Sequence, residues 1–467
     1  MREMLLQDTI AAPATAAGMG AIAVIRVSGK GAIAITSGLF SREKGKKKLT
    51  EIGTHRIVFG RFVSGEEEID EILVSLFRAP HSYTGEDTTE ISCHGSPYIQ
   101  ERIMDALLQA GCRKANPGEF TLRAFINGKL DLTQAEAVAE LISAQSKAHH
   151  QLALQQLRGS VGKGLEDMRE QLIRYASLLE LELDFSEEDV EFANRNEFME
   201  LMQRICKRLQ ELLDSFKGGN AVKNGIPVTI AGAPNTGKST LLNALLGEEK
   251  AIVSPVAGTT RDVIEDVSYI KGVAFRFIDT AGIRSTEDTV EQMGIVRTFA
   301  RVEQASIVFY LAEPGEIEKD TFSEHLNDKR FLNKRLLLLV NKCDLLNKQQ
   351  EEDLSKKLLS LTTHPVFFIS ALHGIGMDKL RLWLEALVEH EYLNTRETVL
   401  ISVRHSDAIR RALDACREAM LRMEAGMSGE LVAQEVRESL YYLGLITGKV
   451  STEDLLDVIF RDFCIGK

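Results

Sequence analysis

Short apolar runs and long apolar stripes divide the chain into segments of different character. Up to about residue 120, short runs such as residues 21–27, 57–60 and 71–76 alternate with Gly and Pro. This pattern is typical of strands joined by turns and predicts a compact α/β or α+β domain. Apolar residues then recur at intervals of three and four, which predicts long amphipathic helices. These stripes are Leu165, Met168, Leu172, Tyr175, Leu179 and Leu183, then Phe198, Met202, Ile205, Leu209, Leu212 and Phe216.

A different pattern interrupts the helical one near residue 220. Gly218-Gly219-Asn220 predicts a break, and beyond it strand-like runs alternate with helical segments, as in a parallel-sheet domain. The strand-like runs are residues 228–231, 273–278, 336–340 and 366–369, and helices are expected at 240–246 and 377–388. Helical stripes return at 409–423 and 432–443. We expect an α/β domain inserted into a helical domain, because insertion at a surface loop with adjacent ends leaves the host core intact.

Composition and charge restrict where the protein can reside and what it can bind. The 467 residues contain no apolar run long enough for a transmembrane helix, and residues 1–8 lack the form of a signal peptide. The six cysteines are scattered without a C-x-x-C pair, which argues against disulfides and zinc and favours a cytoplasmic protein. With a net charge of −12, the chain as a whole does not attract RNA. Residues 44–48 are either a local basic contact for RNA or a solvated loop.

A phosphate-binding loop is the most specific motif. Residues 232–239, Gly-Ala-Pro-Asn-Thr-Gly-Lys-Ser, fit G-x-x-x-x-G-K-[ST]. The glycines let backbone N–H groups converge on nucleotide phosphates, Lys238 reaches the outer phosphates, and the Ser239 hydroxyl joins the Mg²⁺ shell. An apolar run precedes the motif and a helical segment follows it, which is the setting that the motif requires.

Further motifs of a GTP site follow in order. Asp279-Thr280-Ala281-Gly282 ends an apolar run, where the Asp can hold Mg²⁺ through water and the Gly N–H can face a γ-phosphate. A Thr within residues 258–262 can complete the Mg²⁺ shell. In Asn341-Lys342-Cys343-Asp344, the Asp accepts from guanine donors that adenine lacks. Ser370-Ala371-Leu372 follows the last strand, where a backbone N–H would meet the guanine O6.

The residue after the D-x-x-G motif departs from Ras-like GTPases. Ile283 stands where those proteins have a Gln that orients the attacking water, and Ile cannot hydrogen-bond. Nearby polar candidates are Arg284, Glu287, Asp288 and Glu291. Two explanations stay open. Either the chain is a slow GTPase that waits for a partner's residue, or Glu291 acts through water while a monovalent cation replaces the arginine finger.

Motifs outside the nucleotide site resemble the MnmE/TrmE family of tRNA-modification GTPases over essentially the whole length. They are DTIAA at 8–12, IRVSG at 25–29, SYTGED at 82–87, PGEFT at 117–121, RAFINGKLD at 123–131 and the terminal CIGK at 464–467. General translational GTPases do not carry them. The resemblance implies an N-terminal tetrahydrofolate-binding α/β (α+β) domain at 1–121, a central all-α domain in two halves at 122–220 and 389–467, and an inserted Ras-like α/β P-loop GTPase domain at 221–388.

The resemblance also implies partners and a reaction. It implies a homodimer through the N-terminal domains, a complex with the FAD-dependent partner MnmG/GidA, and hydrolysis stimulated by potassium and by pairing of GTPase domains. Together the two proteins would place an aminomethyl or carboxymethylaminomethyl group on C5 of the wobble uridine of certain tRNAs. The one-carbon unit would come from methylenetetrahydrofolate.

Matching motif positions give the site residues that the resemblance implies. Folate would be bound by Arg26, Glu90, Lys129 and Lys467, potassium by Asn235, Ser254, Val256 and Thr259, and magnesium by Ser239 and Thr260. The catalytic set is Glu291, the residue matched to water positioning, with Lys238 and Arg284. The GTP-binding residues would be Asn235, Thr236, Gly237, Lys238, Ser239, Thr240, Ser254, Pro255, Val256, Ala257, Gly258, Thr259, Thr260, Asp279, Thr280, Ala281, Gly282, Asn341, Lys342, Asp344, Ser370, Ala371 and Leu372. Cys464 is a candidate functional cysteine, although a cysteine near a C-terminus also fits in a pocket without reacting.

Two other functions stay open. One is a ribosome-assembly or translation GTPase that binds rRNA, and the other is a folate-dependent one-carbon transferase whose GTPase is only a sensor. Relatives of the first kind usually carry an appended RNA module such as a KH domain with its G-x-x-G loop. The sequence after residue 388 has no such basic segment.

Overall fold

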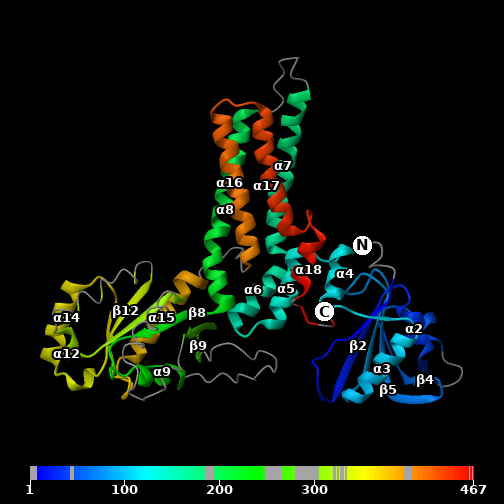
Figure 1. Cartoon of the computed structure of the whole chain (residues 1–467), viewed down its shortest axis with the longest axis horizontal. Coiled ribbons are helices and arrows are strands. Elements are labelled where there is room, and N and C mark those ends of the chain that lie inside the picture. Colours follow the sequence, from blue (N-terminus) through cyan, green and yellow to red (C-terminus); the bar gives the residue numbers. More distant parts are fainter. Residues whose placement is uncertain are drawn as a thin grey trace. The chain divides into compact units, whose positions relative to one another are not determined.

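The structure is a computed structural model in which the chain forms two compact units. One unit comprises Met1–Ser143, Ala153–Leu209 and Asp407–Lys467, and the other comprises Ala144–Leu152 and Gln210–Ser406 (Figure 1). The residues that the structure describes are 8–42, 47–184, 194–247, 266–278, 304–318, 322, 326, 331, 334–393, 402–461, 463, 464 and 466.

The N-terminal part of the first unit is built on a seven-stranded sheet with strand order β3-β4-β5-β6-β2-β1-β7. Neighbouring strands are antiparallel except β1 and β7, which are parallel. The strands are β1 (Ile10–Pro13), β2 (Ile22–Ser28), β3 (Phe40–Ser41), β4 (Arg56–Ser64), β5 (Glu67–Phe77), β6 (Thr88–His94) and β7 (Arg113–Lys114). The helices beside them are α2 (Ala32–Gly38), η1 (Leu49–Glu51) and α3 (Pro97–Gln109).

Alternation along these strands separates a core face from an open face. Val74 of β5 is fully buried, whereas its neighbour Leu73 is 44% exposed, because successive side chains of a strand point to opposite faces. Ile25 of β2 joins the core that α2 and α3 cover. Arg26 and Glu90 lie opposite each other in register on the other face. The predicted α/β (α+β) fold of this part is confirmed.

Helices make up the rest of the first unit. They are α4 (Glu119–Ile126), α5 (Leu132–Ser143), α7 (Ser160–Asp184), α17 (Gly429–Thr447) and α18 (Glu453–Arg461), with parts of α6 (Lys147–Leu157), α8 (Arg195–Asn224) and α16 (Val403–Glu424). The predicted stripes are confirmed, since Leu172 of α7 and Val436 of α17 are fully buried and these two helices pack together. Among the described residues, no helix is both long enough and apolar enough to cross a membrane.

The expected break at Gly218-Gly219-Asn220 is wrong. Helix α8 runs without interruption to Asn224 and is followed by Gly225, whose φ of 76° is in the left-handed region. A glycine inside a helix costs only about 1 kcal/mol relative to alanine. The burial of Val222 in the core of the second unit offsets that cost.

The second unit is built on a six-stranded sheet with strand order β13-β12-β11-β8-β10-β9. All pairs are parallel except β9 with β10. The strands are β8 (Ile226–Ala231), β9 (Asp266–Ile270), β10 (Val273–Phe277), β11 (Ile307–Ala312), β12 (Arg335–Val340) and β13 (Val366–Phe368). The helices are α9 (Lys238–Gly247), α12 (Pro314–Ile317), η4 (Cys343–Leu345), α14 (Lys348–Leu361), α15 (Met377–Leu387) and η5 (Val388–Leu393).

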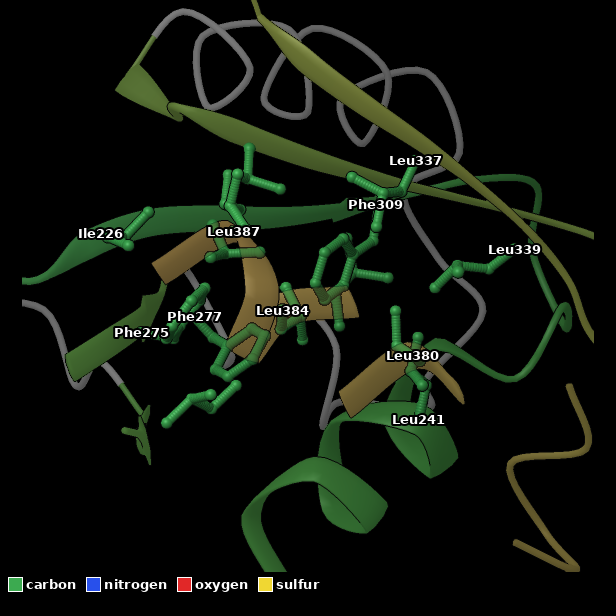
Figure 2. Close-up of a cluster of buried hydrophobic side chains, with 14 of the residues drawn as sticks. Ile226, Leu241, Phe275, Phe277, Phe309, Leu337, Leu339, Leu380, Leu384 and Leu387 are labelled. Atoms are coloured by element: carbon green, nitrogen blue, oxygen red, sulfur yellow. The ribbon is translucent and has the colours of Figure 1, made fainter. Parts of the chain in front are cut away.

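Two hydrophobic cores flank this second sheet. On one face, Phe275 and Phe309 pack with Leu241 of α9 and with Leu380 and Leu384 of α15 (Figure 2). On the other face, α14 contributes Leu354 and Leu358 to a separate cluster. Strands buried on both faces read as continuous apolar runs, as β12 does. The predicted P-loop α/β fold is confirmed, and in such folds ligands bind at the carboxyl ends of the parallel strands.

A buried cluster of charged side chains connects helix α4 to the segments that precede β1 and β6. The fully buried Arg123 of α4 donates to Asp8 Oδ1 at 2.5 Å, to Glu119 Oε1 at 3.0 Å and to Glu86 Oε2 at 3.2 Å. Burial alone would raise the pKa of Glu119, but hydrogen bonds from Arg113, the Asn116 N–H and Arg123 outweigh it and lower that pKa from its ordinary value. The cluster therefore joins residues before β1, before β6 and within α4.

We expect Arg123→Met to destabilise the N-terminal sheet strongly. The substitution leaves Glu119 and Glu86 without their buried counter-ion, a loss of about 3–5 kcal/mol. The pKa of Glu119 is lower in the folded protein than in the unfolded chain, where a glutamate has a pKa of about 4.3. Its ionised form therefore stabilises the fold fully above about pH 4.3, and this stabilisation is lost as the pH falls through the pKa of the folded state. The difference between variant and native protein should therefore shrink below about pH 4. Hydrogen exchange of the β2 and β6 amides measures this difference in stability between the variant and the native protein. The control Arg61→Met, at an exposed side chain of β4 that pairs with the exposed Glu68, should cost about 1 kcal/mol or less, and equal losses would contradict this role.

Candidate functional sites

The phosphate-binding loop joins β8 to α9, and both of its glycines are required sterically. Gly232 has a φ of 144°, and a Cβ there would lie 2.1 Å from the Leu311 carbonyl oxygen. Gly237 has a φ of 93°, and a Cβ there would lie 2.4 Å from Asn341 Nδ2. No other residue type fits either position without moving the backbone.

Lys238 is the first residue of α9 and folds back over the loop. Its Nζ donates to the carbonyl oxygens of Gly232 at 3.1 Å and Ala233 at 2.6 Å. Burial lowers its pKa, and the charge of Glu316 partly opposes that shift. Ser239 and Thr240 follow in the first turn of the helix and are half-buried. An ammonium and the start of a helix at one place form a site suited to an anion such as a phosphate.

Asn341 connects the three described motifs of the second unit. Its side chain is almost fully buried at the end of β12, where Nδ2 donates to the Thr236 carbonyl oxygen at 2.7 Å. Its Oδ1 accepts from the Ala371 N–H at 3.0 Å. One amide thus brings the phosphate-binding loop, the N-K-x-D segment and the Ser370-Ala371-Leu372 segment together at the carboxyl edge of the sheet.

Asp344 carries the carboxylate expected to read guanine. A hydrogen bond with Ser370 lowers its pKa below the ordinary value, helped by the nearby His373 and Lys342. His373 Nε2 lies 3.9 Å from Asp344 Oδ2, and Leu372 beside it is 77% exposed. An ionised carboxylate at pH 7 is an acceptor only, as recognition of two N–H donors requires.

Several expected residues of the nucleotide site lie outside the described residues. They are Ser254, Pro255, Val256, Ala257, Gly258, Thr259, Thr260, Asp279, Thr280, Ala281, Gly282, Arg284 and Glu291. Among the residues that the structure does describe, no three His, Cys, Asp or Glu side chains are grouped so as to hold a metal ion. The magnesium, potassium and catalytic assignments at these positions stay predictions.

The C-terminal segment lies beside two of the expected folate residues. Arg26 Nε donates to Glu90 Oε1 at 3.0 Å, and Arg26 Nη1 donates to the Gly466 carbonyl oxygen at 3.4 Å. Gly466 has a φ of 95°, and a Cβ there would lie 2.0 Å from the Pro13 carbonyl oxygen. The exposed Cys464 accepts from the Gly118 N–H through its carbonyl oxygen at 3.5 Å. Lys467 lies outside the described residues.

Two aromatic residues at this place were not among the predicted site residues. The Arg26 guanidinium lies 5.2 Å from the Tyr83 ring centroid and 5.6 Å from that of Phe120. Burial raises the pKa of Tyr83, whose hydroxyl is 2.9 Å from Thr121 Oγ1. Both residues stand inside the conspicuous motifs SYTGED and PGEFT, which was the available signal. Tyr83 is half-buried and gives the site a flat apolar surface next to a cation, whereas Phe120 is fully buried and contacts Arg26 from the core.

Lys129 belongs to the same neighbourhood through the loop that carries Tyr83. Its Nζ donates to the Pro80 carbonyl oxygen at 3.1 Å, and its stem packs on Gly85. The structure therefore brings Arg26, Glu90 and the C-terminal segment into direct contact and places Lys129 on the loop beside them. A guanidinium, a carboxylate and an ammonium around aromatic rings can bind a planar heterocycle with an acidic tail.

Similar proteins match the chain over nearly its whole length. The family described as "MnmE helical domain" matches residues 132–464, and "GTP-binding protein TrmE N-terminus" matches residues 9–129. The tRNA modification GTPase MnmE of Flavobacterium johnsoniae is 50% identical over 469 residues, covering 99% of this chain and 100% of that protein. The protein of the same name from Bacteroides fragilis is 49% identical over 467 residues, with 99% and 100% coverage. Among solved structures, a single-substitution variant of Aquifex aeolicus Era bound to GDP·AlF4− is 28% identical, covers 40% of this chain and 66% of its own, and has a TM-score of 0.26. The chain belongs to the MnmE/TrmE family of tRNA modification GTPases.

Proposed function

We propose that this GTPase is the GTP-hydrolysing component of a system that modifies the wobble uridine of tRNA. Asn341 brings three GTPase motifs together, and this observation carries the proposal. The same chain matches the N-terminal and helical domains of the family. The names of the relatives support tRNA as the substrate of the system. In this proposal the FAD-dependent partner MnmG/GidA supplies the redox chemistry.

In the proposed GTP site, the described residues Asp344, Lys238, Ser239 and Asn235 act together with Ser254, Val256, Thr259 and Thr260, which lie outside the described residues. Asp344 accepts from the guanine N–H donors, and Lys238 neutralises the outer phosphates. Ser239 holds Mg²⁺ together with Thr260. Asn235 has an exposed side chain and left-handed backbone in the loop, and its amide oxygen is a suitable ligand for a potassium ion with Ser254, Val256 and Thr259. Bound there, potassium would supply the positive charge that an arginine finger supplies elsewhere.

In the proposed folate site, the charged side chains near Arg26 bind different parts of the folate molecule. Glu90 would face the amide and amine edge of the pterin, with Arg26 paired to it at 2.9 Å, and the basic residues Lys129 and Lys467 would face the carboxylates of the glutamate tail. The half-buried Tyr83 provides apolar surface for the ring, and the fully buried Phe120 packs against the Arg26 guanidinium. Methylenetetrahydrofolate bound here would bring the one-carbon unit.

A second copy of the chain is the proposed partner of the open face of the N-terminal sheet. Phe59 of β4 and Leu73 of β5 are register partners that are 59% and 44% exposed, and Ile57 beside them is 70% exposed. An exposed apolar patch of this kind marks an interaction surface. It supports the homodimer that the family implies.

The nucleoside composition of tRNA tests the proposed function. We expect tRNA from cells that lack the chain to lose the modification at C5 of the wobble uridine, because no other step in the proposal installs that carbon. Mass spectrometry of digested tRNA measures it, with the native chain restored as control. Altered ribosomal subunit profiles with intact tRNA would instead support an rRNA-binding GTPase.

Removal of Lys467 tests the folate site. We expect its deletion to weaken binding of 5-formyltetrahydrofolate roughly tenfold, as loss of one charge-assisted hydrogen bond of ~1.5 kcal/mol would. Gly466→Ala should have a similar effect, because a Cβ cannot fit 2.0 Å from the Pro13 oxygen. Calorimetry measures the affinity, and GTP hydrolysis should stay nearly unchanged in both. The control is Lys449→Ala, at an exposed lysine near Glu166, and equal folate affinity in all variants would count against a shared site.

Substitution of Glu291 tests water positioning and the cation. Potassium should stimulate hydrolysis and sodium should not, because the ligand geometry sets the cavity size. Glu291→Ala should lower kcat by ~10²-fold or more, as expected when a group that positions the attacking water is lost, while GTP affinity changes little. Steady-state kinetics in the two salts measures both effects. Equal rates in potassium and sodium would remove the cation from the mechanism, and a fully active variant would assign water positioning to another group.

A further inference from the structure

Lys342 bridges two segments of the nucleotide site through one ammonium group. Its backbone is in the left-handed region, with a φ of 62°. Its Nζ donates to the Asn235 carbonyl oxygen at 3.2 Å and forms an ion pair with the Glu313 carboxylate. The side chains of Lys342 and Glu313 are 40% and 33% exposed. The ammonium therefore has a partner on the phosphate-binding loop and another at the end of β11.

Glu313 is held in place independently of Lys342. It directly follows β11 and is the N-cap of α12, where its backbone carbonyl oxygen accepts from the Glu316 N–H at 3.0 Å. In return, the Glu313 N–H donates to Glu316 Oε2 at 3.1 Å. These two bonds fix the Glu313 backbone, from which the carboxylate extends, at the end of β11. Lys342 is thus anchored at a rigid point.

Asn235, the acceptor of the Lys342 ammonium, is itself a candidate potassium ligand through its side chain. Its φ of 64° is uncommon for a residue other than glycine, so its conformation needs support from its surroundings. The hydrogen bond from Lys342 to its carbonyl oxygen gives that support. The orientation of the Asn235 side chain follows from its backbone.

We propose that Glu313 is a positioning residue that couples guanine recognition to potassium binding. It holds Lys342 on the Asn235 carbonyl oxygen, and so keeps the Lys342 stem beside the base and the Asn235 amide ready for the cation. This inference rests on the proposed potassium-dependent hydrolysis. A simple solvated ion pair, worth about 0–1 kcal/mol, would have no effect on the cation.

Glu313→Gln removes the charge that attracts Lys342 and keeps the size of the side chain. Both bonds between Glu313 and Glu316 involve the Glu313 backbone, so the substitution leaves them in place. We expect the KM for GTP and the potassium concentration for half-maximal hydrolysis each to rise ~3–10-fold, the range that the loss of one such interaction gives. The kcat at saturating GTP and potassium should change less than about twofold, because the chemical step is untouched. Glu313→Asp keeps the charge on a shorter side chain and should recover part of each loss.

Matched variants make the test specific. Glu318→Gln makes the same charge change at the exposed C-cap of α12 and should alter neither parameter. Asp344→Asn removes the guanine acceptor, so it should raise the KM for GTP and admit xanthine nucleotides, yet leave the potassium requirement at saturating GTP unchanged. The thermal unfolding midpoint of each variant reports whether it is folded.

The outcomes separate this inference from the proposed function. A Glu313→Gln variant with native values of both parameters, or with a raised KM alone, overturns the coupling. Native protein with equal rates in potassium and sodium overturns the proposed cation dependence and the coupling with it. A parallel rise in KM and in the potassium requirement, partly recovered in Glu313→Asp, supports both.

Discussion

The nucleotide site depends on the two hydrogen bonds of one buried amide. Asn341 donates to the Thr236 carbonyl oxygen and accepts from the Ala371 N–H, so its polar atoms are satisfied although the side chain is only 4% exposed. A buried amide left without such partners would be costly, and this cost favours one arrangement of the three segments. Gly237 is constrained by the same group, because a Cβ would lie 2.4 Å from Asn341 Nδ2. Gly237 in the loop and Asn341 after β12 therefore depend on each other, because the asparagine amide occupies the space that a side chain at position 237 would need.

A comparable dependence links folding and binding in the N-terminal part. Glu86 accepts from the buried Arg123 and also from Ser28 Oγ at 2.8 Å, which ties the loop before β6 to the end of β2. That loop carries Tyr83, whose ring lies against Arg26. The buried charge cluster thus holds an element of the proposed folate site in place. Charges buried at this depth stabilise a fold less than apolar packing would, so their value here lies in fixing one arrangement.

Sequence patterns predicted those features whose causes are local. The phosphate-binding loop and the N-K-x-D segment stand at strand ends, and the apolar periodicities gave the strands and helices on both sides of them. The break at Gly218 was wrong because glycine propensity is weak and the buried Val222 outweighs it. Glu313 was missed because its role arises from contacts between distant segments, which no local pattern contains. Tyr83 and Phe120 were missed although they stand in the motifs SYTGED and PGEFT, because those motifs do not show that the two rings meet Arg26. Thr260 and Glu291 stay predictions, since they lie outside the described residues.

Helix α8 is unbroken where the chain passes from the first unit to the second. Up to Leu209 the helix belongs to the first unit, and beyond it to the second. Its last turn buries Val222 in the core that includes Ile226 and Val228 of β8, the strand that leads into the phosphate-binding loop. Gly218 and Gly219 therefore lie within the helix and not in a linker. Only Gly225 separates α8 from β8, so the strand that supports the phosphates and the helix that enters the helical domain are nearly one continuous element. The sequence connection from α8 to the phosphate-binding loop is therefore only Gly225 and the six residues of β8.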